Sequence, residues 1–310
     1  MGILVEVNKL SKNFSGIKAV NDLSFTVNEG DVYGFLGQNG AGKSTTIRML
    51  LSLIKPDSGN INIFGKNLQN NRHEVLQQTG AIIERPDLYK YLSAYDNLHI
   101  FAKMSGIKVT PELILDQLKM VGLAERSSSK VKTFSQGMKQ RLGIAVALIH
   151  EPRLIILDEP TNGLDPQGIA DMRKLILNLS SHRGKTVIVS SHLLNEIEQV
   201  ANRMIIIHKG RKIVEGVVTE LLDPAKTIVQ LETTDNETSV VKLRQTEWGP
   251  LLQPSGNFIR LHMNKSAIPL LAETLTRLGV GILSIQPRHS LEDYFLSLTN
   301  AENDVEPVAN

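Results

Sequence analysis

The chain contains no cysteine among its 310 residues. This excludes disulfide scaffolds, thiolate metal sites and cysteine nucleophiles, and it fits a reducing compartment. Long apolar runs are also missing, because none approaches the roughly 20 residues that a membrane-spanning helix needs. The N-terminus has no basic segment followed by an apolar one, so nothing in the sequence indicates an export signal. We therefore expect neither disulfides nor a membrane-spanning helix.

A strong net charge is missing as well. The net charge is +2, and the 41% apolar and 21% charged residues are ordinary for a globular protein. The charge is unevenly distributed: residues 217–310 hold 12 acidic and 7 basic side chains, and residues 1–216 hold 20 acidic and 27 basic ones. The modestly basic first part suits an anionic ligand such as a nucleotide. The absence of a run of five basic residues argues against nucleic acid as a partner.

The length predicts two domains, because a domain usually has about 150 residues. Predicted strands at 32–36, 154–157, 186–190 and 204–207 alternate with predicted helices at 45–53, 172–179 and 193–200. This alternation predicts a mostly parallel sheet with helices on its faces. Additional strands at 4–7 and 23–27 and a hairpin through Phe64-Gly65 add an antiparallel part. The pattern covers residues 1–216.

Residues from about 93 to 150 are typical of helices instead. Ser93-x-x-Asp96 has the form of a capping box, and Thr110-Pro111 resembles an N-cap followed by proline at the first helical position. We expect a helical subdomain inserted into the sheet domain here.

Beyond Gly216, predicted strands at 227–231, 258–262 and 280–285 and a helix at 266–278 indicate a small accessory α+β domain over residues 217–300. Residues 301–310 are polar and acidic, which predicts a disordered tail.

A glycine-rich loop follows the predicted strand Val32–Leu36. Its sequence, Gly37-Gln38-Asn39-Gly40-Ala41-Gly42-Lys43-Ser44, matches G-x-x-x-x-G-K-[ST]. Glycines let backbone N–H groups wrap a phosphate chain, and the N-terminus of the next helix favours the same anion. Lys43 is expected to reach the β- and γ-phosphates, and Ser44 to ligate Mg²⁺. The predicted nucleotide contacts are Gly37, Asn39, Gly40, Ala41, Gly42, Lys43, Ser44 and Thr45. The loop alone leaves kinases, GTPases and ATPases open.

The apolar strand at 154–157 ends in two carboxylates, Asp158 and Glu159. Asp158 is placed to hold Mg²⁺ through water, and Glu159 to orient and deprotonate an attacking water. The alternative is an exposed acidic turn after a core strand.

The segment Phe134-Ser135-Gln136-Gly137-Met138 precedes that strand. It resembles the signature sequence of ATP-binding cassette (ABC) ATPases, whose commonest form is Leu-Ser-Gly-Gly-Gln. Ser135 and Gly137 match this form, whereas Phe134, Gln136 and Met138 depart from it. The resemblance implies that Ser135 and Gly137 bind a γ-phosphate at a helix N-terminus.

Three more positions carry the same resemblance. Pro160 to Asp165 resembles the D-loop of the family, with Asp165 as its acidic residue. His192 resembles the switch histidine that contacts the γ-phosphate. Phe14 stands where the family stacks an aromatic ring on adenine, and a phenylalanine in the core is the alternative.

Glu84 departs from the general pattern of the family. It occupies the position of the usual glutamine in the loop between the core and the helical subdomain. This resembles the ATPases of bacterial self-protection exporters for lantibiotics and bacitracin, in which an "E-loop" replaces the glutamine. The chain length and the segment Ser290–Leu296 resemble the same group. The resemblance places Glu84 beside Mg²⁺ and the phosphates; the alternative is a chance change from glutamine.

The resemblance implies an α/β P-loop ABC ATPase core that binds ATP and Mg²⁺, with Glu159, His192 and Lys43 as catalytic residues. Since one chain supplies one phosphate loop and one signature, a dimer with itself or a paralogous ABC subunit is expected. A separate permease and a place on the cytoplasmic face of the membrane are also implied. The expected function is ATP hydrolysis that drives export of an antimicrobial peptide or hydrophobic drug. A soluble ABC ATPase acting on ribosomes or DNA and an importer ATPase are the alternatives.

Overall fold

The computed structural model describes residues 2–181, 183–222, 227–253 and 258–289. The chain divides into two compact units, Met1–Val217 and Val218–Asn310. The division falls one residue after the boundary expected from the sequence. The segment Ser290–Leu296 and the expected tail at 301–310 lie outside the described residues.

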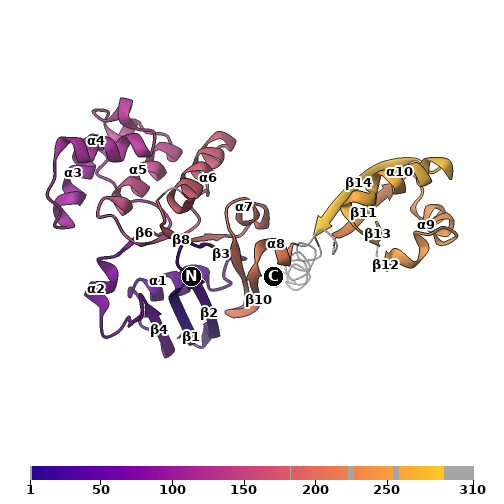
Figure 1. Cartoon of the computed structure of the whole chain (residues 1–310), viewed down its shortest axis with the longest axis horizontal. Coiled ribbons are helices and arrows are strands. Elements are labelled where there is room, and N and C mark those ends of the chain that lie inside the picture. The colour runs from indigo at the N-terminus through magenta and orange to yellow at the C-terminus, as the bar shows by residue number, and fades with distance from the viewer. Residues whose placement is uncertain (1, 182, 223–226, 254–257, 290–310) are drawn as a thin grey trace, which may run out of the picture. The chain divides into compact units, whose positions relative to one another are not determined.

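A six-stranded sheet organises the first unit, and Figure 1 shows it at the centre of that unit. In spatial order its strands are β10 (Arg211–Val217), β9 (Arg203–His208), β3 (Val32–Gly37), β8 (Thr186–Ser191), β7 (Leu154–Leu157) and β6 (Thr79–Ile82). All neighbours are parallel except β10, which pairs antiparallel with β9. Every residue of β3, β7 and β8 is buried, as expected for parallel strands that are covered on both faces.

A four-stranded sheet with the order β2-β1-β4-β5 supplies the antiparallel part. Its strands are β1 (Ile3–Phe14), β2 (Ile17–Asn28), β4 (Ser58–Ile63) and β5 (Lys66–Asn67). The last two form the hairpin expected at Phe64-Gly65. One apolar core joins the two sheets and the helix α1 (Lys43–Leu50), with Leu10, Phe35 and Ile47 among its fully buried members. This core fixes the phosphate loop at the end of β3.

The helical part contains α3 (Ala94–Met104), α4 (Pro111–Met120) and α5 (Gln136–Leu148), which lie together in Figure 1. The capping box at the start of α3 is present: the Ser93 hydroxyl accepts a hydrogen bond from the Asp96 N–H at 3.0 Å, and the Asp96 carboxylate accepts one from the Ser93 N–H. Thr110 caps α4, and Pro111 is its first residue. The shorter α2 (Arg72–Leu76), the helix α6 (Pro166–Ser181) and α7 (Leu194–Glu198) complete this unit.

The second unit is an antiparallel sheet with helices. Its sheet has the order β12-β13-β11-β14. The elements are α8 (Val218–Leu221), β11 (Thr227–Thr233), α9 (Asn236–Arg244), β12 (Leu252–Gln253), β13 (Ile259–His262), α10 (Ile268–Arg277) and β14 (Ile282–His289). Alternate residues of β11 and β13 point into a core that also contains Trp248 and Leu271. The helix α9 was not expected from the sequence.

Within the ranges that the structure describes, no helix has the length and apolar character needed to cross a lipid bilayer.

Candidate nucleotide-binding and catalytic site

The glycine-rich loop connects the end of β3 to the start of α1. Gly40 and Gly42 have φ angles of 81° and 104°, which side-chain-bearing residues rarely adopt. A Cβ atom on Gly42 would lie 2.4 Å from the Ala19 carbonyl oxygen, and one on Gly37 would lie 2.8 Å from the Ile207 carbonyl oxygen. Neighbouring backbone therefore requires glycine at both positions. The loop conformation that the motif predicts is present.

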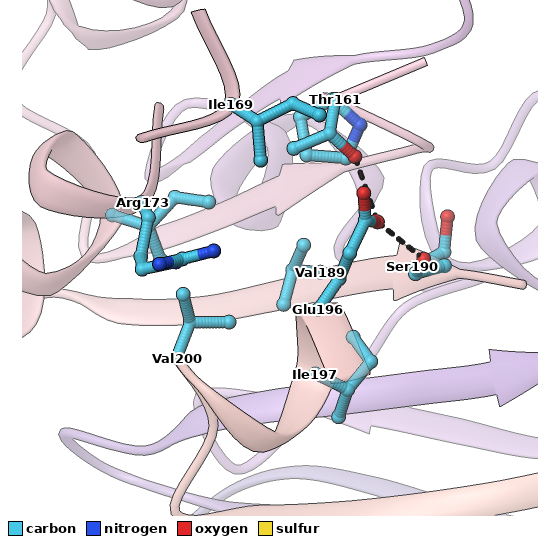
Figure 2. A pocket seen from close by; sticks show the side chains of 11 residues that line it. Thr161, Ile169, Arg173, Val189, Ser190, Glu196, Ile197 and Val200 are labelled. Atoms are coloured by element: carbon cyan, nitrogen blue, oxygen red, sulfur yellow. Dashed lines mark hydrogen bonds between the residues drawn. The ribbon is translucent and has the colours of Figure 1, made fainter. Parts of the chain in front are cut away.

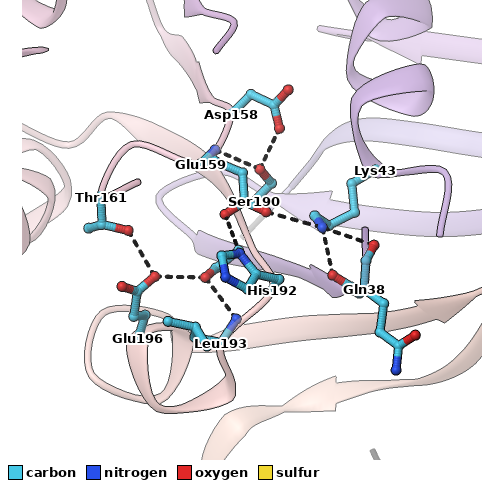
Figure 3. Close-up of polar contacts among 11 residues, drawn as sticks. Gln38, Lys43, Asp158, Glu159, Thr161, Ser190, His192, Leu193 and Glu196 are labelled. Atoms are coloured by element: carbon cyan, nitrogen blue, oxygen red, sulfur yellow. Dashed lines mark hydrogen bonds and ion pairs between the residues drawn. The ribbon is translucent and has the colours of Figure 1, made fainter. Parts of the chain in front are cut away.

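Lys43 connects this loop to the carboxylates after β7. Its side chain is only 5% exposed, and its Nζ donates hydrogen bonds to the carbonyl oxygens of Gly37 at 2.6 Å and Gln38 at 3.2 Å. The same Nζ lies 3.1 Å from Glu159 Oε1 (Figure 3). A buried ammonium at a helix N-terminus, held by exchangeable partners, is suited to a phosphate group.

Asp158 and Glu159 follow β7 directly, as the sequence predicts. Asp158 is 1% exposed, and its Oδ1 accepts a hydrogen bond from the Ser190 hydroxyl at 2.6 Å. Its Oδ2 is buried and has no hydrogen-bond partner among the described residues. Oxygen is the ligand that Mg²⁺ prefers, and Mg²⁺ often keeps waters and substrate phosphates as its other ligands. Asp158 therefore fits a bound Mg²⁺.

The Glu159 carboxylate lies between the side chains of Lys43 and His192. Its Oε2 lies 2.8 Å from His192 Nδ1, which completes a chain from Lys43 through Glu159 to His192 (Figure 3). Its backbone N–H donates to the Ser190 hydroxyl at 2.9 Å, and its φ of 49° is left-handed. A fixed, largely buried carboxylate at this edge can accept a proton from water. The exposed-turn alternative does not hold, since the Glu159 side chain is only 17% exposed.

Ser190 was not singled out in the sequence. Its hydroxyl donates to the Asp158 carboxylate and accepts from the Glu159 backbone N–H, so it connects β8 with one carboxylate and with the backbone of the next residue. Its position two residues before His192, near the end of a strand that runs parallel to β7, is the feature of the sequence that could have indicated it.

Ser44 and Thr45 lie in the first turn of α1 and are partly buried.

Phe14 is the last residue of β1, and its side chain is 43% exposed. This exposure rules out the core alternative. The Lys12 ammonium lies 5.4 Å from the ring centroid. The assignment to adenine stays a prediction.

Glu84 has a partner that the sequence did not reveal. Its carboxylate Oε1 lies 2.6 Å from Nη2 of Arg48 in α1, and the side chain is 65% exposed. Its φ of 59° is left-handed, which is uncommon for a residue other than glycine. The Asp158 N–H donates to the Ile82 carbonyl oxygen, so the backbone two residues before Glu84 adjoins the segment that carries Asp158 and Glu159. Its expected contact with Mg²⁺ stays a prediction.

The signature and D-loop residues begin helices. The Ser135 hydroxyl accepts a hydrogen bond from the Met138 N–H at 3.2 Å and caps α5, and Gly137 is in the first turn. Asp165 Oδ1 accepts one from the Gly168 N–H at 2.9 Å at the start of α6. Ser135 and Asp165 are exposed. Both side chains contact their own helices in this single chain.

Residues 20–162 match the family model described as "ABC transporter". The bacitracin transport ATP-binding protein BcrA of Bacillus licheniformis is 42% identical over 300 residues, which cover 96% of this chain and 98% of that protein. An uncharacterized ABC transporter ATP-binding protein, YhcH of Bacillus subtilis (strain 168), is also 42% identical, over 96% of this chain and 97% of its own length.

Two solved structures resemble the chain in fold. One is an ATP-binding subunit of an ABC transporter, with a TM-score of 0.62 and 32% identity; the match covers 70% of this chain and 91% of that one. The other is a dimeric post-hydrolysis state of the ATP-binding cassette MJ0796 with ADP and Pi, with a TM-score of 0.63 and 25% identity. That match covers 69% of this chain and 99% of the other.

Proposed function

The chain belongs to the ATP-binding proteins of the ABC transporter family, and from this premise we propose that its hydrolysis of ATP drives export of an antimicrobial peptide or hydrophobic drug. The observation that supports the chemistry best is the contact chain Lys43–Glu159–His192 across the ends of β3, β7 and β8. The relative that transports bacitracin supports the choice of cargo.

The site residues divide the reaction among them. Lys43 exchanges its loop carbonyls for the β- and γ-phosphates, whose charge it balances. Glu159 accepts a proton as the water oxygen bonds to the γ-phosphorus and the bond to the ADP oxygen breaks, which yields ADP and Pi. His192 keeps the Glu159 carboxylate oriented through the 2.8 Å contact and would also contact the γ-phosphate. Asp158 and Ser44 would hold Mg²⁺, which neutralises charge on the phosphates.

A second subunit completes each site in this proposal. Ser135 and Gly137 are exposed or partly exposed at the N-terminus of α5. They would bind the γ-phosphate held by the other subunit, and Asp165 would contact that subunit as well. The partner is a second copy or a paralogous ABC subunit. The dimeric cassette with ADP and Pi supports this arrangement.

A permease contact is proposed for the segment from Glu84 to Tyr91. Tyr89 and Tyr91 are exposed large side chains here, and Pro86 restricts the backbone between them and Glu84. Exposed aromatic side chains are common in protein interfaces. Because the permease is a membrane protein, this contact would hold the chain at the cytoplasmic face of the membrane.

The test combines enzymology with membrane extraction. The full chain should hydrolyse ATP, and Glu159→Gln should remove the activity while ATP binding persists. An epitope-tagged chain solubilised from membranes with detergent should co-purify with one permease, and deletion of its gene should sensitise cells to a bacitracin-type peptide. Hydrolysis without membrane association or any peptide phenotype would contradict the export proposal and leave the ATPase assignment intact.

A further inference from the structure

Two successive serines at the end of β8 face different partners. Ser190 bonds to Asp158 and Glu159, whereas the Ser191 hydroxyl donates to Glu196 Oε2 at 2.7 Å. Ser191 also accepts a hydrogen bond from the Leu193 N–H at 3.0 Å, which closes a turn around His192. Successive side chains of a strand alternate between its faces. One serine therefore contacts the Asp158 carboxylate and the Glu159 backbone, and the other links the turn around His192 to α7.

The Glu196 carboxylate joins two loops through one oxygen. Its Oε2 accepts the second hydrogen bond from the Thr161 hydroxyl at 2.8 Å (Figure 2 and Figure 3). Thr161 lies two residues after Glu159, and Ser191 immediately precedes His192. The carboxylate thus binds both of the segments whose side chains meet at the 2.8 Å contact between Glu159 and His192.

The surroundings of Glu196 argue for a role in positioning. It lines a cavity of about 20 Å³, which holds at most about one water molecule. The other walls are mostly apolar and include Ile169, Val189 and Ile197, and Figure 2 shows Arg173 among the lining side chains. Such a volume excludes a substrate. Hydrogen bonds to a charged acceptor are strong, and apolar surroundings strengthen them further.

We propose that Glu196 is a positioning residue for ATP hydrolysis: by tying Thr161 to Ser191 it holds Glu159 and His192 at the spacing that catalysis requires. This rests on the proposed roles of Glu159 and His192. In this proposal Glu196 acts through Thr161 and Ser191 and not on the nucleotide itself. Its loss should therefore lower kcat and leave ATP affinity nearly unchanged.

The experiment compares three variants of the full chain by steady-state ATPase kinetics. Glu196→Ala removes a charge-assisted acceptor of two hydroxyl groups, so kcat should fall about tenfold while KM for ATP stays within about twofold. Glu196→Gln keeps an acceptor oxygen at the same reach and should restore kcat to within about threefold of the wild type. Glu198→Gln, at an exposed carboxylate on the same helix, is the matched control and should retain wild-type kinetics.

Thr161→Val and Ser191→Ala test the two hydrogen bonds separately. Each should lower kcat in the wild-type background and have little further effect in the Glu196→Ala background, because contacting residues are not additive. If Glu196→Ala does not fold, the kcat values of these two variants and of Glu196→Gln test the proposal in its place. A wild-type kcat in Glu196→Ala, or additive effects of the three substitutions, would overturn the proposal.

Glu159→Gln, measured in parallel, separates this inference from the proposed function. If Glu159→Gln is inactive and Glu196→Ala is fully active, only the positioning role fails. If Glu159→Gln keeps wild-type turnover, the catalytic assignment fails and the positioning role fails with it. If Glu196→Ala lowers both the melting temperature and kcat, and Glu196→Gln restores neither, Glu196 has only a structural role and the proposal is wrong.

Discussion

The proposed catalytic edge, which is formed by the ends of β3, β7 and β8, differs in construction from the loop around Glu84. At this edge Asp158 and Lys43 are buried. The Asp158 carboxylate is contacted by Ser190, and the Glu159 carboxylate by Lys43 and His192. Glu84 is exposed, and within the described part of the chain its one ion pair is with Arg48. An exposed pair contributes about 0–1 kcal/mol, so it can be exchanged at little cost. The comparison predicts large effects on chemistry at the edge and smaller effects on coupling at the loop.

Glu159→Gln should have the largest effect. The amide keeps the shape of the side chain but cannot accept the proton of the attacking water, so kcat should fall about 10²–10⁴-fold. ATP binding should persist, because Lys43 and the glycine loop are unchanged. The ATP-bound protein should then accumulate as a dimer, which size-exclusion chromatography detects. Near-wild-type turnover in the purified variant would contradict the assignment of the base.

Ser135→Arg should abolish ATPase activity without affecting ATP binding to the isolated subunit. The bulky cation at the exposed start of α5 would block closure of the dimer and lies outside the chain's own phosphate loop. A mixture with a Lys43→Ala chain is the stricter measurement, since opposed faces could leave one intact composite site and restore some activity. Loss of ATP binding by the single variant would show that Ser135 acts in its own site.

Much of this edge could be predicted from the sequence, because each motif is local. The strand Leu154–Leu157 has the predicted limits, since a fully buried apolar run ends at two carboxylates. The helix α6 begins at Pro166, earlier than the predicted Met172, because the Asp165 carboxylate caps its first turn and the apolar spacing does not include these residues. The helix α9 was missed because it buries only Ser239 and Leu243.

The supporting contacts could not be predicted. Ser190, Glu196 and Arg48 act through side chains that meet only when strands or helices distant in sequence come together: Arg48 is 36 residues from Glu84, and Thr161 is 35 residues from Glu196. The pattern of apolar residues in one sequence indicates which face of a helix or strand is buried, but not which side chains of different elements form hydrogen bonds. The left-handed backbone conformation of Glu84 could not be predicted from the sequence either.

Glu84→Gln tests the other side of the comparison. The substitution removes a charge outside the buried edge, so ATP hydrolysis should stay within about threefold, far less than the roughly 10²-fold expected for loss of a catalytic base. Resistance to the exported peptide should nevertheless fall measurably at matched protein levels, because the loop contacts the permease in the proposed function. Glu29→Gln, at an exposed carboxylate that pairs with Arg153 at 2.8 Å, is the matched control. Unchanged resistance to every candidate lantibiotic or bacitracin-type peptide would remove the argument for peptide self-protection, and the ATPase assignment would remain.

Arg48→Ala should have the smallest effect on the folded protein. Both partners of the Arg48–Glu84 pair are substantially exposed, so its loss should cost no more than about 1 kcal/mol of unfolding free energy. For a unit of this size that corresponds to a shift in melting temperature of about 2–4 °C or less. Arg48→Lys keeps the positive charge and should lower the melting temperature less than Arg48→Ala does. The double variant Arg48→Ala/Glu84→Gln should match the single variants in stability, since both remove the same pair. A much larger shift in melting temperature would mean that the Glu84 loop is held as firmly as the proposed catalytic edge. The Arg48–Glu84 ion pair would then stabilise the fold and would not break when nucleotide binds.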